Sequence, residues 1–115
     1  MPMHEYSIVQ ALLTQCKEIA QENRAHKVVK IITKIGVMSG VETHLFQVAF
    51  DTFKEGTICD GAQLIIHGQK LKLHCNACGC EFEIDKLRYI CKECKSLDVK
   101  VVDGEDMYLM SLEMD

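Results

Sequence analysis

The sequence predicts an α+β fold, in which a small core mixes helices with an antiparallel sheet and carries an inserted four-cysteine ribbon. Three observations lead to this prediction. Two segments repeat apolar residues at three- and four-residue steps, the period of a helix that is buried on one side. Other segments alternate apolar and polar residues, as half-buried strands do. Two Cys-x2-Cys pairs, separated by twelve residues, lie between the predicted core strands.

The front of the chain is predicted to form a helix and then a strand. Residues 5–21 carry one apolar helical face, which consists of Ile8, Val9, Leu12, Leu13, Cys16, Ile19 and Ala20. Residues 27–36 are rich in β-branched side chains that alternate with lysines, which favours a strand with one buried side. Asn23 lies between the two segments, and we expect it to end the helix.

A second helix is predicted between Ser39 and Gly56. Ser39 and Glu42 fit a capping box, in which the hydroxyl accepts from an early backbone N–H and the carboxylate reaches back. Apolar side chains then follow at helical spacing, namely Leu45, Phe46, Ala49, Phe50 and Phe53. Three of the four phenylalanines lie in this segment, so we expect them to pack in the core rather than to bind a ligand.

The rest of the chain is predicted to form strands. One runs from Leu64 through Leu73 into the first cysteine pair, with Gly68 as a bend or bulge. A short strand covers residues 81–85. A turn at 103–105 precedes a closing strand over 107–114, which most simply returns to the core sheet. Alternation places four side chains on one face of that closing strand: Tyr108, Met110, Leu112 and Met114.

The two cysteine pairs predict a closed metal site. A structural Zn²⁺ ion takes four thiolates from two tight turns, and these are supplied by Cys75, Cys78, Cys91 and Cys94. Two disulfides in a secreted domain are the alternative. Seven cysteines are an odd number, however, and no signal peptide precedes the first helix. We therefore expect zinc in a site with no open position for catalysis.

The other cysteines are expected to lie outside the metal shell. Cys80 would disturb the Cys-x2-Cys turn as a competing ligand, so we interpret it as a spare thiol. Cys16 lies on the apolar face of the first helix and is expected in the core. Cys59 follows the second helix in a predicted loop, where we expect it to be exposed. His74 adjoins Cys75 and is expected to face solvent.

Composition and charge exclude several classes of function. The formal net charge of −4 argues against a general nucleic-acid binder, and no apolar run reaches the length of a membrane span. The sequence contains no nucleophile–base arrangement, phosphate loop or open catalytic metal motif, so we do not expect an enzyme. These features, together with the cysteine usage, predict a soluble protein of a reducing compartment, the cytoplasm.

A second candidate metal site lies at the start of the chain. His4 stands between Met3 and Glu5, directly before the first predicted helix. An N-terminal amine, an imidazole and the deprotonated amides between them form chelate rings around one ion. Such planar nitrogen sites suit Ni(II) or Cu(II) better than Zn(II). The Glu5 carboxylate adds a nearby oxygen, and it would also favour the positive end of the helix.

With both motifs in place, the whole chain resembles the HypA/HybF hydrogenase-maturation factors. The shared features are Met3-His4-Glu5-Tyr6-Ser7, the strand end at Gly36, the helix that closes at Gly56-Thr57, the two cysteine pairs, and Ser111-Leu112-Glu113-Met114. The resemblance implies a nickel metallochaperone, not an enzyme. It implies a nickel-binding α/β domain, here residues 1–69 plus 104–115, and a zinc-ribbon domain, here residues 70–103. Nickel is then expected at Met3, His4 and Glu5, and zinc at the four cysteines.

The resemblance also implies partners. Such proteins help to insert Ni²⁺ into the large subunit of [NiFe]-hydrogenase, together with a nickel-handling GTPase. In some bacteria they also supply nickel for urease maturation, which makes a urease nickel accessory protein a further candidate. Delivery is expected by ligand exchange, because ligands of the partner can attack an exposed N-terminal site. We expect a monomer or homodimer, with neither nucleic acid nor membrane as a partner.

The nickel motif departs from the family pattern at one point. The family motif begins at a methionine that carries the free amine, whereas Met1 and Pro2 precede Met3 here. One alternative is that the amine lies on Met3. The other is that removal of Met1 leaves the free amine on Pro2, so that this amine, two backbone amides and the His4 imidazole wrap one planar ion.

Two other classes of function stay open. Lys86, Arg88, Lys92 and Lys95 form the only basic cluster, all within the ribbon. A zinc-ribbon module that binds protein or nucleic acid would explain the cysteines and this cluster, but not the N-terminal motif. The cluster also fits solubility alone. An iron-binding, rubredoxin-like electron carrier would share the cysteine pairs and would be red in its ferric form.

Overall fold

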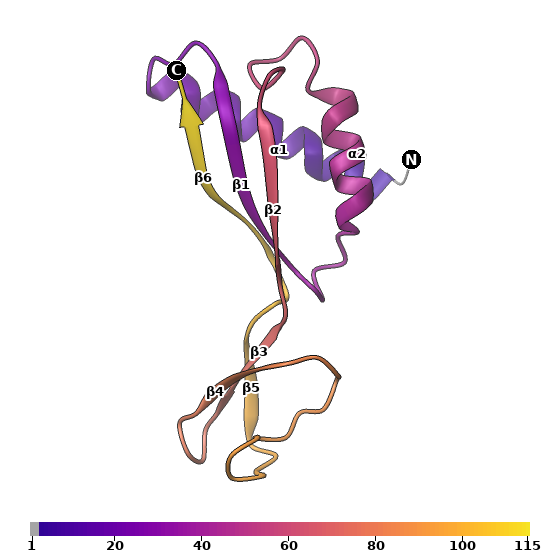
Figure 1. The fold of residues 1–115 in the computed structure, drawn as a ribbon, viewed down its shortest axis with the longest axis vertical. Helices are drawn as coiled ribbons and strands as arrows, with labels where there is room; N and C mark the ends of the chain where they lie inside the picture. The colour runs from indigo at the N-terminus through magenta and orange to yellow at the C-terminus, as the bar shows by residue number, and fades with distance from the viewer. Residues whose placement is uncertain (1–2) are drawn as a thin grey trace.

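The computed structural model describes the backbone of residues 3–115 and the side chains from Glu5 onward. Two helices and six strands follow one another along the chain: α1 (Met3–Glu22), β1 (Val28–Gly36), α2 (Thr43–Phe53), β2 (Gln63–Gln69), β3 (Leu71–Cys75), β4 (Glu81–Ile84), β5 (Val99–Asp103) and β6 (Met107–Met114). They form two units joined by a narrow neck (Figure 1), and the molecule is elongated, with extents of 53 × 31 × 16 Å.

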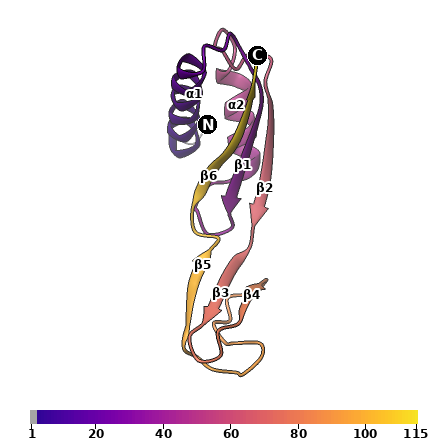
Figure 2. The same cartoon turned by 90° about the vertical axis from the view of Figure 1, so that its left-hand side faces the viewer.

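The core sheet has the strand order β2-β1-β6, and α1 crosses one of its faces (Figure 2). The α+β class is confirmed. One detail differs, because β1 pairs with β2 in parallel and with β6 antiparallel. The connection from β1 to β2 contains α2, and such a crossover returns the chain so that both strands run in the same direction. The core sheet is therefore mixed rather than wholly antiparallel.

Both helices form where apolar periodicity predicts them, but α2 begins differently. Glu42 is the residue that caps α2, and its carboxylate accepts from the backbone N–H groups of His44 and Leu45. Ser39 lies in the preceding turn, where its hydroxyl accepts from the N–H of Val41 at 3.2 Å. The capping box predicted for Ser39 is therefore wrong, since a carboxylate closer to the helix takes the free N–H groups.

The predicted strand from Leu64 to Leu73 is divided into two strands. β2 belongs to the core sheet, whereas β3 is the centre of a second sheet with the order β4-β3-β5. The break falls at Lys70, and Gly68 does not interrupt the pairing of β2 with β1. β5 was not predicted from the sequence. Its antiparallel pairing with β3 completes the ribbon sheet.

β6 returns to the core sheet as predicted, but it does not keep one face along its length. Ile32 pairs with Ser111 and Thr33 pairs with Leu109, so Met110 is an extra residue in the ladder. Such a bulge changes which side chains point inward. Leu112 and Met114 pack on the core, whereas Tyr108 and Met110 are 44% and 55% exposed. The predicted common face of these four side chains is therefore wrong.

The neck consists of the segments that connect the two sheets. The backbone N–H groups of Gly36, Val37 and Met38 donate to carbonyls of Asp106, Gln69 and Gly104. A side chain on Gly36 would lie 2.3 Å from the Gly104 backbone, and one on Gly104 would lie 2.6 Å from the Lys70 carbonyl. Only glycine allows the connecting segments to approach this closely.

Each unit has its own hydrophobic cluster. The larger one joins both helices to the core sheet and includes Val9, Ile31, Ile35, Phe46 and Phe50. This confirms that the phenylalanines of α2 pack in the core. The cluster of the ribbon is much smaller, and its buried members are Leu71, Leu73 and Ile84. So small a cluster gives the ribbon little hydrophobic stabilisation of its own.

Candidate metal centre

The first cysteine pair lies where β3 ends. Cys75 is the last residue of β3, and its N–H donates to the carbonyl of Cys80 at 2.8 Å. The N–H of Gly79 donates back to the Cys75 carbonyl, and Gly79 has a φ of +79°. The left-handed glycine therefore closes the turn that was predicted around Cys78.

The second pair lies in a similar turn outside the strands. The N–H of Cys91 donates to the Ser96 carbonyl, and the N–H of Lys95 donates to the Cys91 carbonyl at 3.0 Å. Here Lys95, with a φ of 63°, occupies the left-handed position. The two turns face each other across the tip of the ribbon.

The four sulfurs predicted as ligands come together. All four lie within 4.8 Å of one another. The sulfur of Cys75 is 3.6 Å from that of Cys94, and the sulfur of Cys78 is 3.6 Å from that of Cys91. A tetrahedral zinc with sulfur ligands at about 2.3 Å requires sulfur–sulfur distances of about 3.8 Å. The cysteine cage therefore fits a tetrathiolate metal ion.

Local hydrogen bonds shift the pKa values of the Cys91 and Cys78 thiols differently. The N–H of Cys94 donates to the Cys91 sulfur at 3.4 Å and lowers the pKa of Cys91 to about 6. The N–H of Cys80 lowers the pKa of Cys78, but burial and the neighbouring thiols outweigh it and raise that pKa to about 12. The local hydrogen bonds therefore favour the thiolate of Cys91 more than that of Cys78, and metal binding replaces the protons of both.

The N-terminal motif lies in the first turn of α1. The backbones of Met3, His4 and Glu5 are helical there, while Pro2 and the side chains of Met3 and His4 lie outside the described residues. The Glu5 side chain is only 4% exposed, and its Oε2 receives no hydrogen bond from the part of the chain that is described. The Glu5 carboxylate, which was predicted to lie near the nickel site, is therefore largely shielded from solvent.

Comparison with known proteins covers the whole chain. The family model described as hydrogenase/urease nickel incorporation, metallochaperone, HypA, matches residues 3–114. The hydrogenase maturation factor HypA of Aquifex aeolicus is 50% identical over 113 residues, which are 98% of each chain. HypA of Shewanella baltica is also 50% identical over 113 residues, covering 98% of this chain and 97% of its own.

The chain belongs to the HypA family.

Solved HypA structures share the fold. The solution structure of the Ni metallochaperone HypA from Helicobacter pylori has a TM-score of 0.68, with 39% identity and 96% coverage of both chains. A second HypA solution structure has a TM-score of 0.75, with 40% identity, and covers 99% of this chain and 98% of its own. The predicted resemblance to hydrogenase-maturation factors is confirmed. The family is one of metallochaperones for nickel incorporation, and this member carries a metal-binding four-cysteine site.

Two polar neighbours of the cysteine cage, Cys80 and His74, make contacts with Glu81. The Cys80 sulfur lies 3.7 Å from the Glu81 carbonyl and is not among the four clustered sulfurs. Nδ1 of His74 lies 3.2 Å from a carboxylate oxygen of Glu81, across the β3–β4 pairing. Both side chains are therefore held outside the cysteine cage, as the sequence predicted for Cys80.

The remaining two cysteines are both buried in the core. Cys16 lies there as predicted, but Cys59 is also fully buried, so its predicted exposure is wrong. The loop after α2 is folded on itself: the Thr57 hydroxyl donates to the Lys54 carbonyl and accepts from the N–H of Cys59. This turn directs the Cys59 side chain inward, against the core cluster that also contains Cys16.

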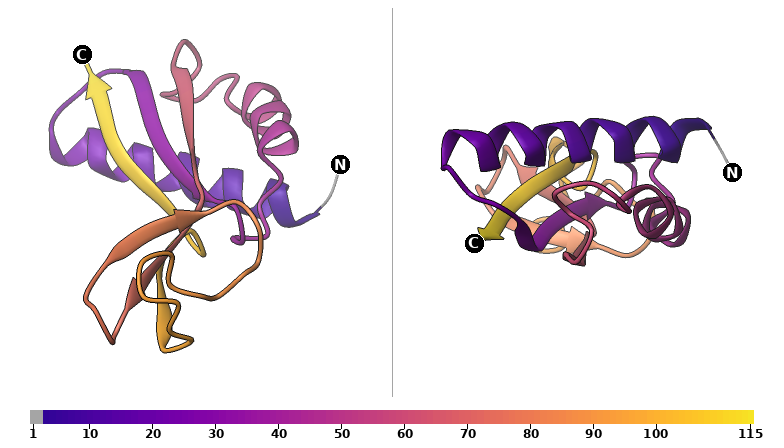
Figure 3. Two further views of the ribbon diagram at one scale, coloured as in Figure 1. Left: turned by 60° about the horizontal axis from the view of Figure 1, so that its bottom comes forward. Right: turned by 90° about the horizontal axis from the view of Figure 1, so that it is seen from above.

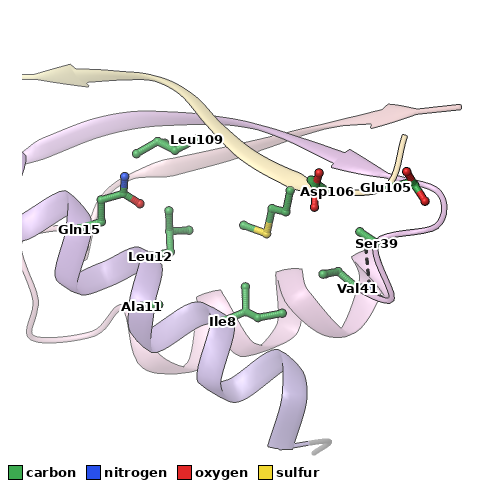
Figure 4. Close-up of a pocket in the computed structure, with 10 residues that line it drawn as sticks. Ile8, Ala11, Leu12, Gln15, Ser39, Val41, Glu105, Asp106 and Leu109 are labelled. Atoms are coloured by element: carbon green, nitrogen blue, oxygen red, sulfur yellow. Dashed lines mark hydrogen bonds between the residues drawn. The ribbon is translucent and has the colours of Figure 1, made fainter. Parts of the chain in front are cut away.

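A groove that the sequence did not indicate lies between α1 and the start of β6 (Figure 4). It has a volume of about 340 Å³. Ile8 and Leu12 form part of one wall, while Glu105 and Asp106 lie at the end near Ser39. Its walls come from segments far apart in the chain, so no local pattern links them.

In the described range 3–115, neither helix has the length and apolar character that crossing a membrane requires.

Proposed function

We propose that this HypA-family protein is a nickel metallochaperone that delivers Ni²⁺ during maturation of [NiFe]-hydrogenase, without being an enzyme itself. The observation that carries the proposal is the match of residues 3–114 to a family of nickel-incorporation metallochaperones. The fold supports it, because the candidate nickel motif at the start of α1 and the cysteine cage belong to different units (Figure 1). The nickel that is delivered and the metal that stays in the cysteine cage thus have separate proposed sites.

The cysteine cage is proposed to hold a structural Zn²⁺ ion. Four sulfurs at tetrahedral separations match the ligand set of closed zinc sites, whose role is to stabilise small folds. Cys75 and Cys91 are buried, while Cys78 and Cys94 lie at the surface, and no fifth donor completes the shell within residues 3–115. We therefore assign this site no part in nickel transfer.

Nickel is proposed to bind at the start of the chain, through His4 with Met3 and Glu5, and through Pro2 where it carries the free amine. The first backbone N–H groups of α1 have no acceptor within the helix, so a metal can displace their protons and bind the nitrogens without breaking a helical hydrogen bond. Glu5 supports the assignment in a second way. A buried carboxylate oxygen without a partner is costly, and a donor or cation at the N-terminal residues would offset that cost.

Transfer is proposed to proceed by ligand exchange. A planar nitrogen site at a chain end is open to attack by donor atoms of a partner, which displace the N-terminal ligands one at a time. The proposed partners are a nickel-handling GTPase and the hydrogenase large subunit, with a urease nickel accessory protein as a further recipient because the family description also names urease. We place this exchange in the cytoplasm, with the protein as a monomer or homodimer.

The two units are proposed to be separable domains, with residues 1–69 plus 104–115 holding nickel and residues 70–103 holding zinc. Two separate sheets and two separate hydrophobic clusters support this division.

Native mass spectrometry of the protein offered both metals tests the proposal. We expect one zinc and one nickel per chain, with only the nickel lost in the His4→Ala variant. His26→Ala is the matched control, because His26 is exposed and lies beyond the far end of α1. The intact mass also identifies the first residue, and acetylation of the N-terminal amine should abolish nickel binding.

Two results of these experiments would reject the proposed nickel site. Zinc without any nickel that depends on His4 would reject the N-terminal site in this protein, and a zinc-ribbon interaction module would become the better description. Nickel binding that survives N-terminal acetylation would reject the amine as a ligand.

A further inference from the structure

The ribbon carries a concave site that the nickel proposal does not use. It has a volume of about 590 Å³ and lies between the end of β4 and the long segment that leads to β5. Figure 3 shows this segment as an orange loop that arcs away from the ribbon sheet. Ile84 and Ile90 form an apolar floor, which continues along the chain into the proposed metal ligand Cys91, and Ile84 is buried. The site is therefore part of the folded ribbon and not a gap between the units.

Four cations line the same site, namely Lys86, Arg88, Lys92 and Lys95. They are the basic cluster of the sequence, now gathered around one cavity. Within the described residues 3–115, none of the four forms an ion pair with a carboxylate. Surface cations that form no ion pair attract an external anion more strongly than paired ones.

Two of these cations are held in place by backbone carbonyls. Lys92 Nζ donates to the Glu83 carbonyl at 2.7 Å and lies 5.8 Å from the centre of the Phe82 ring. Lys95 Nζ donates to the Lys92 carbonyl at 3.2 Å. These contacts fix the ammonium groups without neutralising their charge. A fixed charge loses less conformational entropy when a ligand binds.

The one acid in the lining is already paired. Asp85 lies 2.7 Å from Lys70 Nζ, and this ammonium lowers the pKa of Asp85, with a further contribution from the charge of Lys92. Asp85 is therefore paired mainly with Lys70, and of the four cations only Lys92 contributes to the shift of its pKa. Next to them along the chain, Leu87 and Tyr89 are exposed, so apolar and basic side chains alternate at the edge of the site.

From this arrangement we infer that the ribbon cavity is a docking site for an acidic segment of a partner protein. Carboxylates of the segment would pair with the cations at the rim, and an apolar side chain would contact the isoleucines at the floor. This inference is independent of nickel binding and assigns the ribbon a role beyond holding a metal.

The charge balance favours a short acidic peptide over a nucleic acid. A metal-loaded tetrathiolate contributes two net negative charges beside Cys91, and Glu93 contributes another, so the rim keeps a net charge of only about +1. The chain as a whole is at −4. A polyanion would meet this negative surface beyond the cavity, whereas a segment with a few carboxylates would not.

Fluorescence anisotropy of the zinc-loaded protein tests the inference with a labelled peptide that alternates glutamate with leucine and serine. We expect binding with a Kd below about 1 mM that weakens with added salt. The Lys86→Glu/Arg88→Glu variant should weaken it at least tenfold. NMR titration should shift the amide signals of residues 84–95 and leave those of α1 unchanged.

Matched controls separate this site from general charge effects. Lys17→Glu/Lys27→Glu makes the same change in net charge at exposed positions of the other unit and should bind as the unaltered protein does. The Lys86→Ala/Arg88→Ala pair is measured as well, with zinc content verified, so that a folding defect in the charge reversal does not decide the result. A peptide with glutamine in place of glutamate should not bind.

Several outcomes would overturn the inference. They are equal binding by the charge-reversed ribbon, equal weakening by the control pair, or no binding below 1 mM. Tighter binding of a single-stranded oligonucleotide at the same residues would assign the cavity to nucleic acid instead.

Discussion

At the scale of single residues, two glycines determine how closely the chain packs in the neck. Gly104 combines a φ of +102° with a backbone approach that leaves no room for a Cβ atom. Gly36 faces it across the same contact, since its own Cβ would meet the Gly104 backbone. Gly104 is therefore required both by conformation and by packing, and Gly36 is required by packing alone.

We predict that Gly104→Ala lowers the free energy of unfolding by about 3 kcal/mol, because left-handed strain and a backbone clash add together. Urea unfolding followed by circular dichroism measures the change. Gly56→Ala is the matched control: its φ is +76°, yet no atom lies within 4 Å of the added Cβ. It should cost about 1 kcal/mol from strain alone. Equal costs for the two variants would show that the close approach in the neck contributes nothing.

The cysteine ligands were predictable at this scale, but the positions of other single residues were not. Cys-x2-Cys spacing describes a local turn, so it identifies Cys75, Cys78, Cys91 and Cys94 without knowledge of the fold. Cys59 lacks such a local rule, because its burial depends on how the loop after α2 folds back on the core. The groove between α1 and the start of β6 was equally unpredictable from the sequence, since its walls meet only in the tertiary structure.

At the scale of elements, apolar periodicity gave the helices correctly, whereas the divisions between strands depend on tertiary pairing. The apolar side chains shift from even positions, Leu64 and Ile66, to odd positions in Leu71 and Leu73, but this shift fits a bend or bulge as well as a break between two sheets at Lys70. β5 was missed because it lies at the end of a ribbon loop and acquires its partner, β3, only when the ribbon closes. The bulge at Met110 likewise arises from the pairing of β6 with β1. Side chains that alternation alone places on one face of β6 therefore lie on different faces before and after the bulge.

The cap of α2 gives a pH prediction. The N–H groups of Leu45 and His44 hold the pKa of Glu42 below its ordinary value. A carboxyl with a lowered pKa stabilises the fold above its ordinary pKa, and this contribution is lost as the pH falls through the lowered value. We therefore expect the Leu45 amide signal to titrate below the usual range of glutamate, with fraying of the first turn of α2 at more acidic pH. NMR measures both effects.

Glu42→Gln is the control for that titration. The amide oxygen still accepts one hydrogen bond but carries no proton equilibrium, so the Leu45 signal should become independent of pH in the same range. A titration that persists in Glu42→Gln would assign the effect to another carboxyl group.

At the scale of the whole molecule, the two units differ in what holds them together. The core has a large hydrophobic cluster, whereas the hydrophobic cluster of the ribbon has only three buried members within the described chain. The contact between Lys34 Nζ and Asp103 Oδ2, at 2.7 Å, is one of the few that tie β1 to the end of β5. Metal is thus expected to be needed for the folding of the ribbon but not for the folding of the core.

We predict that Cys91→Ser abolishes zinc binding and unfolds the ribbon while the core stays folded, because the ribbon has no adequate hydrophobic cluster to replace the metal. Metal analysis and a ¹H–¹⁵N spectrum distinguish the two units, since signals of residues 71–101 should collapse and those of α1 should persist. Cys80→Ser is the control and should keep both zinc and spectrum. Loss of α1 signals in Cys91→Ser would contradict the separability of the two units.

The neck has one more consequence, which concerns entropy rather than contact. Both connections to the ribbon pass through it side by side, so for the core the ribbon is a closed loop of its own chain. A disordered loop of roughly 34 residues costs about 3 kcal/mol to close, some 2 kcal/mol more than a tight turn. Disorder in the ribbon would then reduce the stability of the core through chain connectivity alone. Removal of the metal from the ribbon should therefore lower the melting temperature of the core.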